Sequence, residues 1–455
     1  MREWGEAMET SKIEMENKRI AALDGIRTIS IIFIMWLHIW EQSWLTPYID
    51  FNNVVTRYFG ITESYLQRYV RFGAVFVEMM ILLCAVCNFL PYARSIVLGE
   101  PWPDAVVFWK KRAIRILPSY YLAVVIPFLI SVFTKNYDSV WFALKDFLSD
   151  ITFTNIFFER LNVNSQINGV LWTVQTEVWI YLLFPFLAKA MKKKPFVTLG
   201  SLWGVGLIVT QVARYNFPNR IRSIGIYNPL NYLILLANGF LIMVLYYKFY
   251  DLLQDKYVNA LGVLITISSI VWFNQILRSI DFGNAGKDIM LIENRVSIEL
   301  CFTAILVGIL LSGKISSVVL GNKFFAYMSG ILYNLYLWHQ WIAVTLKKWK
   351  IPNYEGDVPP NEIMDVAWSR KYSLIIVILS FAVAILVTKF YEKPISEKLR
   401  ARITTSDGIK RKPEKKNRTI RWNKVEKKDG TDVQRTDNIS RGGDLTVEDL
   451  DNWEE

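Results

Sequence analysis

Long apolar runs, each about as long as a bilayer is thick, recur along most of the chain. A helix needs about 20 mainly apolar residues to cross the hydrocarbon core. Ten segments meet this requirement: 21–44, 72–90, 113–134, 168–188, 196–213, 229–247, 257–277, 297–319, 324–346 and 372–391. One soluble core cannot absorb so much apolar sequence. The pattern predicts an all-α polytopic membrane bundle of about ten transmembrane helices.

The basic residues predict how this bundle is oriented. An even number of crossings places both termini on one side, and short loops on that side are rich in positive charge. The residues concerned are Lys12, Lys18, Arg19, Arg94, Lys110, Lys111, Arg112, Lys189, Lys192, Lys193 and Lys194. Such an excess is typical of cytoplasmic loops. We expect a multi-pass protein of the plasma membrane with both termini cytoplasmic and with 45–71, 135–167 and 347–371 outside.

The composition changes near Ser396, where a charged and apolar-poor stretch begins. Such a stretch cannot bury enough apolar surface to fold alone. We therefore expect three parts, namely a cytoplasmic segment 1–18, a transmembrane domain 19–395 and a disordered cytoplasmic tail 396–455.

The three cysteines do not indicate a metal centre. Cys84, Cys87 and Cys301 all lie in predicted helices, so the Cys-x-x-Cys spacing favours packing over a zinc or redox site. We predict no bound metal. Motifs for nucleic-acid binding and glycine-rich phosphate loops are also missing from the sequence, so we expect no nucleic-acid partner.

Four ionisable residues interrupt the apolar runs, namely His38, Glu78, Glu177 and His339. Ionisable side chains are costly in hydrocarbon, so they usually face a protein interior or a water-filled cavity and mark function. In the predicted topology all four lie past the midplane on the outer side. A hydrogen-bonded core residue is the competing interpretation for each one alone. Their common depth favours one shared site.

Positive charge gathers at the cytoplasmic ends of two predicted helices. Arg27 lies inside the first apolar run, and Arg112 and Arg115 are three residues apart on one helical face. Topology alone would place some basic residues there. However, Arg27 and His38 are separated by about 16 Å along a straight helix, which is comparable to the arm of coenzyme A between its phosphates and its thioester. This geometry would bring a cytosolic acyl thioester to an outer acceptor.

Five segments in order resemble the motifs of a known family of integral-membrane acyltransferases, acyltransferase family three. They are LDGIRTISIIFIMWLH, RAIRILPSYY, LWTVQTEVWIYLLFP, NLYLWHQW and YEKPI, and the resemblance spans roughly residues 18–396. Members O-acylate, usually O-acetylate, cell-surface glycans, and some modify small molecules. The surroundings of Glu78 depart from the usual pattern, with Met80-Ile81 and Cys84-Ala85 where paired Phe and then Ser-Gly are common.

The resemblance implies roles for the residues that match the motifs. His38 corresponds to the histidine regarded as catalytic, while Glu177, His339 and Glu78 occupy other motif or acidic positions. Arg27, Arg112 and Arg115 correspond to residues implicated in handling acyl-CoA. The resemblance also places Trp172, Tyr181 and Trp338 in the glutamate and late histidine motifs, and we expect these three to bind substrate.

These observations give a hypothesis of O-acyl transfer, with acetyl-CoA as donor and an extracytoplasmic or lipid-linked carbohydrate as acceptor. His38 would act as general base or as acyl carrier. Glu78 or Glu177 would orient its ring, and His339, Tyr181, Trp172 or Trp338 would donate to the oxyanion. A proton-coupled transporter is the alternative, because two His and two Glu at one depth also describe a proton relay. A scaffold subunit with a recruiting tail is a third interpretation.

Overall fold

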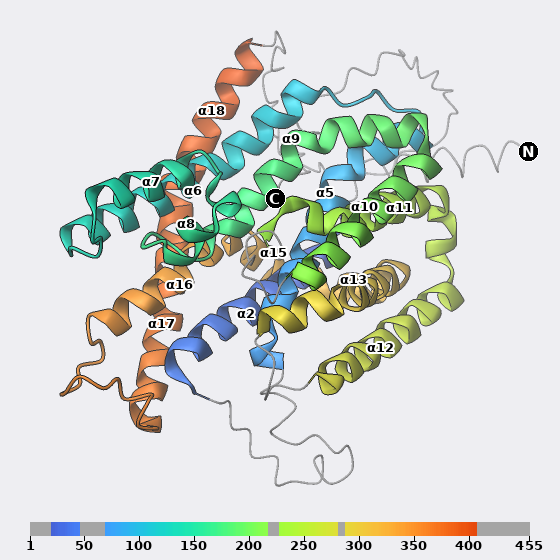
Figure 1. The fold of residues 1–455 in the computed structure, drawn as a ribbon. Coiled ribbons are helices and arrows are strands. Elements are labelled where there is room, and N and C mark those ends of the chain that lie inside the picture. The colour runs from blue at the N-terminus through green and yellow to red at the C-terminus, as the bar shows by residue number, and fades with distance from the viewer. Residues whose placement is uncertain (1–19, 46–68, 217–226, 281–286, 407–455) are drawn as a thin grey trace, which may run out of the picture. The chain divides into compact units, whose positions relative to one another are not determined.

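The computed structural model describes residues 20–45, 69–216, 227–280 and 287–406 (Figure 1). All regular secondary structure in these ranges is helical, so the predicted all-α polytopic bundle is confirmed. Residues Ile20–Glu397 form one compact unit. The predicted N-terminal segment 1–18 lies outside the described residues.

Nine helices in the described ranges are long and apolar enough to cross a membrane. They are α2 (Ala22–Ser43), α5 (Phe76–Val97), α6 (Ala105–Phe133), α9 (Leu171–Lys193), α10 (Pro195–Asn216), α11 (Leu233–Lys248) together with the 3₁₀ turn η5 (Pro229–Tyr232) before it, α12 (Lys256–Ser279), α13 (Lys287–Leu311) and α17 (Val366–Val387). Each corresponds to one of the ten segments expected from hydropathy.

The tenth segment, expected as one helix over 324–346, is broken into two pieces. A short helix α15 (Lys323–Ser329) is followed by α16 (Leu332–Lys348), which has 17 residues. Gly330 and Ile331 separate the two pieces. The preceding segment is also divided, because Gly313 at φ +52° ends α13 and starts α14 (Lys314–Leu320). These breaks bring α14 and α15 against α2.

The predicted outer stretch 135–167 contains two further helices, α7 (Val140–Ile151) and α8 (Glu159–Asn164), joined through the 3₁₀ turn η2 (Asn155–Phe157). Helix α7 directs its polar side inward, where Asp146 and Asp150 are buried. Its apolar side is outward, with Trp141 64% exposed. The segment therefore packs against the rest of the protein through its polar side chains, which hydropathy alone did not indicate.

The last part of the described chain continues as helix beyond α17. A π-helical turn η7 (Thr388–Glu392) leads into α18 (Lys393–Ser406). The predicted tail 396–455 thus begins within a helix, and residues 407–455 lie outside the described residues.

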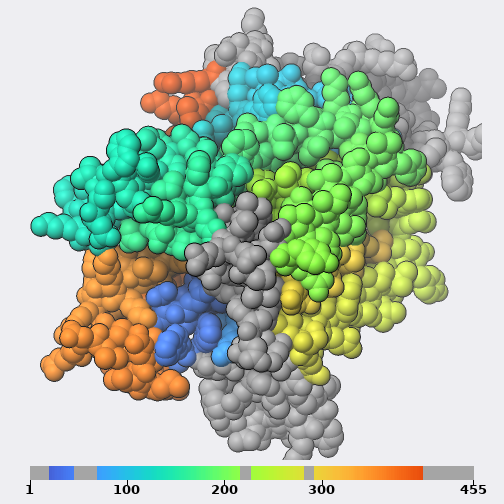
Figure 2. Space-filling view, in the orientation of Figure 1, coloured from blue at the N-terminus to red at the C-terminus, as the bar shows by residue number. Residues whose placement is uncertain are grey.

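Helix α2 is the centre of the packing around the site and contacts α5, α14, α15, α16 and α17. A Cβ at Gly73, in the 3₁₀ turn η1 (Gly73–Val75) before α5, would lie 2.3 Å from the Phe33 carbonyl oxygen of α2. Glycine therefore allows these backbones to touch. Part of α2 (blue) is visible at the surface beside α16 and α17 (orange) in Figure 2.

Candidate active site

The two histidines of the chain contact each other across the interface of α2 and α16. His38 Nδ1 lies 2.8 Å from His339 Nε2, although 301 residues separate them in sequence. His339 is completely buried, whereas His38 is half-buried. The structure therefore brings together two of the four ionisable residues that the sequence singled out.

The hydrogen bonds of His339 assign the tautomers of both rings. His339 Nδ1 lies 2.8 Å from the Tyr336 carbonyl oxygen and 3.1 Å from that of Leu335. Carbonyl oxygens only accept, so the neutral ring carries its proton on Nδ1 and presents a lone pair at Nε2. His38 Nδ1 must then donate to that lone pair. The basic lone pair of His38 is consequently at Nε2, the atom a general base or nucleophile would use.

Within the described residues, Glu177 makes no hydrogen bond to His38 or His339. Its Oε2 accepts a hydrogen bond from the Tyr181 hydroxyl at 3.3 Å. The positive charges of Arg115, Arg27 and Arg112 act on its carboxylate. The three predicted acyl-CoA arginines, from α2 and α6, thus gather around one acidic residue on α9.

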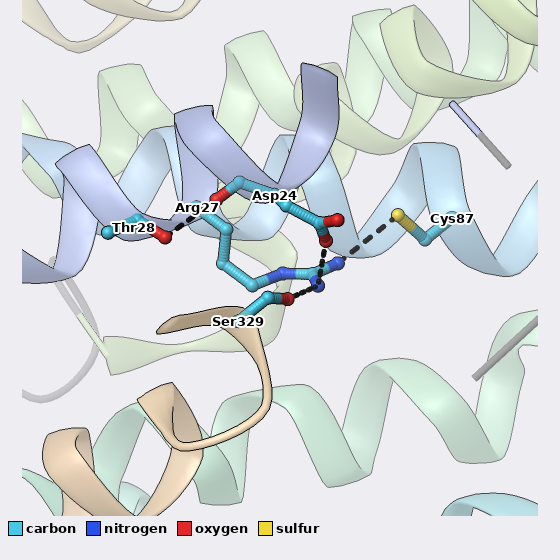
Figure 3. Close-up of polar contacts among 5 residues, drawn as sticks. All are labelled: Asp24, Arg27, Thr28, Cys87 and Ser329. Atoms are coloured by element: carbon cyan, nitrogen blue, oxygen red, sulfur yellow. Dashed lines mark hydrogen bonds and ion pairs between the residues drawn. The ribbon is translucent and has the colours of Figure 1, made fainter. Parts of the chain in front are cut away.

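The guanidinium of Arg27 is held by three helices (Figure 3). It donates to Ser329 Oγ of α15 at 3.2 Å and to Cys87 Sγ of α5 at 3.4 Å, and it lies 3.8 Å from Asp24 Oδ1 of its own helix. On the same helix, the Thr28 hydroxyl donates to the Asp24 carbonyl oxygen one turn earlier. The Arg27 side chain is still 21% exposed. It is therefore oriented but not fully enclosed.

Three of the motif segments meet at Glu392, which was not among the predicted site residues. Glu392 Oε2, in the π-helical turn, accepts hydrogen bonds from Asn334 Nδ2 of α16 and from Ser119 Oγ of α6. Asn334 is four residues before Trp338 in the quoted late histidine motif, and Glu392 lies in the quoted YEKPI. π-Helical turns are frequent at functional sites. The motifs contained this signal, but a sequence cannot show that they touch.

The two tryptophans expected to bind substrate lie in different surroundings. Trp172 packs against Tyr227, with ring centroids 4.5 Å apart, and against the buried cluster of Ala213 and Ile292. Trp338 is 3% exposed and packs edge-on against Trp341. Its indole Nε1 has no hydrogen-bond partner among the described residues. Trp338 therefore has an unused donor and precedes His339 in the sequence, while Trp172 takes part in packing.

Glu78 belongs to a different group of charges. Its Oε1 lies 3.3 Å from Arg295 Nε of α13, and both side chains are buried. Glu299, one turn further along α13, is also buried. Arg295 and Glu299 were not predicted as site residues, although charged residues inside an apolar helix are the same signal that singled out Glu78 and Glu177.

No group of three or more His, Cys, Asp or Glu side chains suited to a metal ion occurs within residues 20–45, 69–216, 227–280 and 287–406. The three cysteines have free thiols. The Cys84 thiol donates to the Tyr181 hydroxyl at 3.4 Å, so it takes part in the polar packing around Glu177.

Comparison with known proteins identifies the family. No curated protein and no solved structure matches the chain. A family model described as an acyltransferase domain matches residues 20–389, which includes all ten predicted site residues. This match covers most of the chain and runs from the start of α2 to beyond the end of α17. The chain therefore belongs to the membrane acyltransferases of acyltransferase family three.

Proposed function

We propose that this acyltransferase moves an acetyl group from cytosolic acetyl-CoA to a hydroxyl of an extracytoplasmic or lipid-linked carbohydrate. The observation that carries the proposal is the contact between His38 and His339, because it leaves the basic lone pair at His38 Nε2. The donor and the carbohydrate acceptor are suggested by the family resemblance.

The arginine group suits the polyanionic end of acetyl-CoA. Guanidinium groups bind phosphates through paired, charge-assisted hydrogen bonds. Arg27, Arg112 and Arg115 share the field of Glu177, which offsets part of their mutual repulsion before the donor binds. α2 runs as an unbroken helix from Arg27 to His38, so the two ends remain about 16 Å apart. The pantetheine arm would bridge this distance.

The proposed reaction conserves its proton within the site. His38 Nε2 takes the proton of the acceptor hydroxyl as its oxygen attacks the thioester carbonyl carbon. The tetrahedral intermediate then expels the CoA thiolate by breaking the C–S bond, and His38 returns the proton to the sulfur. While His38 is charged, its Nδ1–H bond to His339 becomes charge-assisted and stronger. His339 is thus a positioning residue.

Two details of the chemistry remain alternatives. His38 Nε2 can instead attack the thioester itself and carry the acetyl group before the hydroxyl accepts it. In either route the oxyanion needs a donor, and the indole N–H of Trp338 is the candidate favoured by its burial without a partner in the described chain. Tyr181 is less suited, because its hydroxyl already donates to Glu177.

The membrane orientation forms part of the proposal. Counting α16 with the nine spanning helices gives an even number of crossings, so both termini would be cytoplasmic in the plasma membrane. Lys192 and Lys193, in the last turn of α9, then lie on the cytoplasmic side. The outer surface would include exposed aromatic rings such as Trp44, on which a sugar could stack.

The test compares purified wild type and His38→Ala in detergent, with acetyl-CoA and a mixed extract of cell-envelope glycans as acceptor. We expect the wild type to release free CoA only when acceptor is present, and the variant to bind acetyl-CoA without releasing CoA. Trp40→Phe, on the same helix, is the matched control and should behave as wild type.

Two results would contradict the proposal. Turnover by His38→Ala at the wild-type rate would remove this histidine from the chemistry. Solute flux driven by a proton gradient in proteoliposomes, without consumption of acyl-CoA, would favour the proton-coupled transporter instead.

A further inference from the structure

A buried group of charges lies between α5, α13 and the 3₁₀ turn η5 (Pro229–Tyr232), and the proposed mechanism does not use it. Glu78, Arg295 and Glu299 are 4%, 2% and 0% exposed. Arg295 lies over the ring of Tyr232, with its Cζ 5.2 Å from the centroid. Arg295 and Glu299 are four residues apart on α13, so they share one helical face.

The charges of this group do not balance if every member is ionised. Two carboxylates and one guanidinium leave one negative charge, and Tyr232 adds no positive one. An unpaired charge inside a protein is strongly unfavourable, and such a group usually neutralises. One added proton makes the group neutral without another residue.

The hydrogen-bond pattern indicates which carboxyl takes that proton. Glu78 Oε1 is paired with Arg295, so Glu78 is the natural carboxylate. Both oxygens of Glu299, and also Glu78 Oε2, are buried and have no hydrogen-bond partner among the described residues. Protonation of Glu299 supplies a hydroxyl donor where these three carboxyl oxygens have no partner.

We infer that the Glu78–Arg295–Glu299 group is a proton-binding site in the membrane domain, separate from the histidine pair, with the proton held on Glu299. A metal cation fits the same place less well. It needs several oxygen ligands and would meet the positive charge of Arg295. A proton needs neither a coordination shell nor a cavity.

The test is infrared spectroscopy of the purified protein, in which a protonated carboxylic acid absorbs above the amide band. We expect Glu299→Gln to lose the intensity of one protonated carboxyl relative to wild type. Glu78→Gln should lose it as well, because Arg295 then takes Glu299 as its counter-ion. Glu362→Gln, at an exposed glutamate, is the control and should leave the band unchanged.

An unchanged band in Glu299→Gln would overturn the inference, and so would a band that wild type loses when sodium is added. If the variants do not fold, wild type can be treated with a lipid-soluble carbodiimide, which forms a stable adduct with protonated buried carboxyls. Mass spectrometry should then find the adduct on Glu299, and its absence there would also overturn the inference. None of these readouts depends on acyl transfer.

Discussion

Replacing His339 by leucine removes the acceptor of the His38 Nδ1–H bond while filling most of the space of the imidazole ring. The bond is 2.8 Å long, and its acceptor is completely buried. In the transition state it would hold a charged imidazolium, and hydrogen bonds to charged groups contribute about 1.5–3 kcal/mol. The expected loss in kcat is therefore roughly ten- to 150-fold. The Kd of acetyl-CoA should stay unchanged, because Arg27 lies at the other end of α2 and Arg112 and Arg115 are on α6.

The glutamine variant separates positioning from a general structural role. A glutamine at position 339 can accept from His38 through its amide oxygen and donate to the carbonyl of Tyr336 through its amide nitrogen. It should therefore recover part of the lost kcat. The assay is acceptor-dependent CoA release under saturating acetyl-CoA, with thermal unfolding measured in parallel. If the kcat of the leucine variant stays within about threefold of wild type, or about 0.7 kcal/mol, His339 does not position His38.

Three more predictions test the donor site, the packing of α2 and the buried Asp146 of α7. Arg27→Ala should raise the Kd of acetyl-CoA about tenfold, since a charge-assisted contact contributes about 1.5 kcal/mol; isothermal titration calorimetry measures this, with Arg214→Ala as the unaffected control. Gly73→Ala should destabilise the protein by about 1–3 kcal/mol, because its Cβ would meet a backbone oxygen at 2.3 Å. Gly200→Ala, which meets nothing within 4 Å, should not lower the thermal midpoint. Burial raises the pKa of Asp146 above its usual 3.8, so the folded state binds the proton more tightly and stability falls as pH rises above that value. Asp146→Asn should therefore be more stable than wild type at neutral pH in thermal unfolding, and the gain should shrink on acidification; a gain independent of pH would contradict this.

The positions of the spanning helices were readable from sequence, because hydropathy averages over a whole helix. The same averaging hid details that individual residues decide. A window that begins at 297 leaves out Arg295, which is inside α13. The break at Gly330 was also missed, since one glycine hardly changes the mean of an apolar run. The exact ends of the helices therefore needed the structure.

The site was predictable as a set of residues but not as a set of contacts. His38 and His339 were both selected from their unusual surroundings. Their pairing depends on how α2 and α16 pack, which no local pattern encodes. For the same reason, the sequence offered Glu78 and Glu177 as orienting groups, whereas the structure pairs them with Arg295 and Tyr181.

The shortness of α16 links this protein to the thickness of the lipid around it. A helix of 17 residues rises about 26 Å, less than the roughly 30 Å of a typical hydrocarbon core. Lys347 and Lys348 lie in its last turn, where long basic side chains can reach towards the headgroups. Long lipid chains would draw these ends into hydrocarbon unless the bilayer around the helix that carries Trp338 and His339 becomes locally thinner. Membranes with short acyl chains should therefore suit the enzyme best.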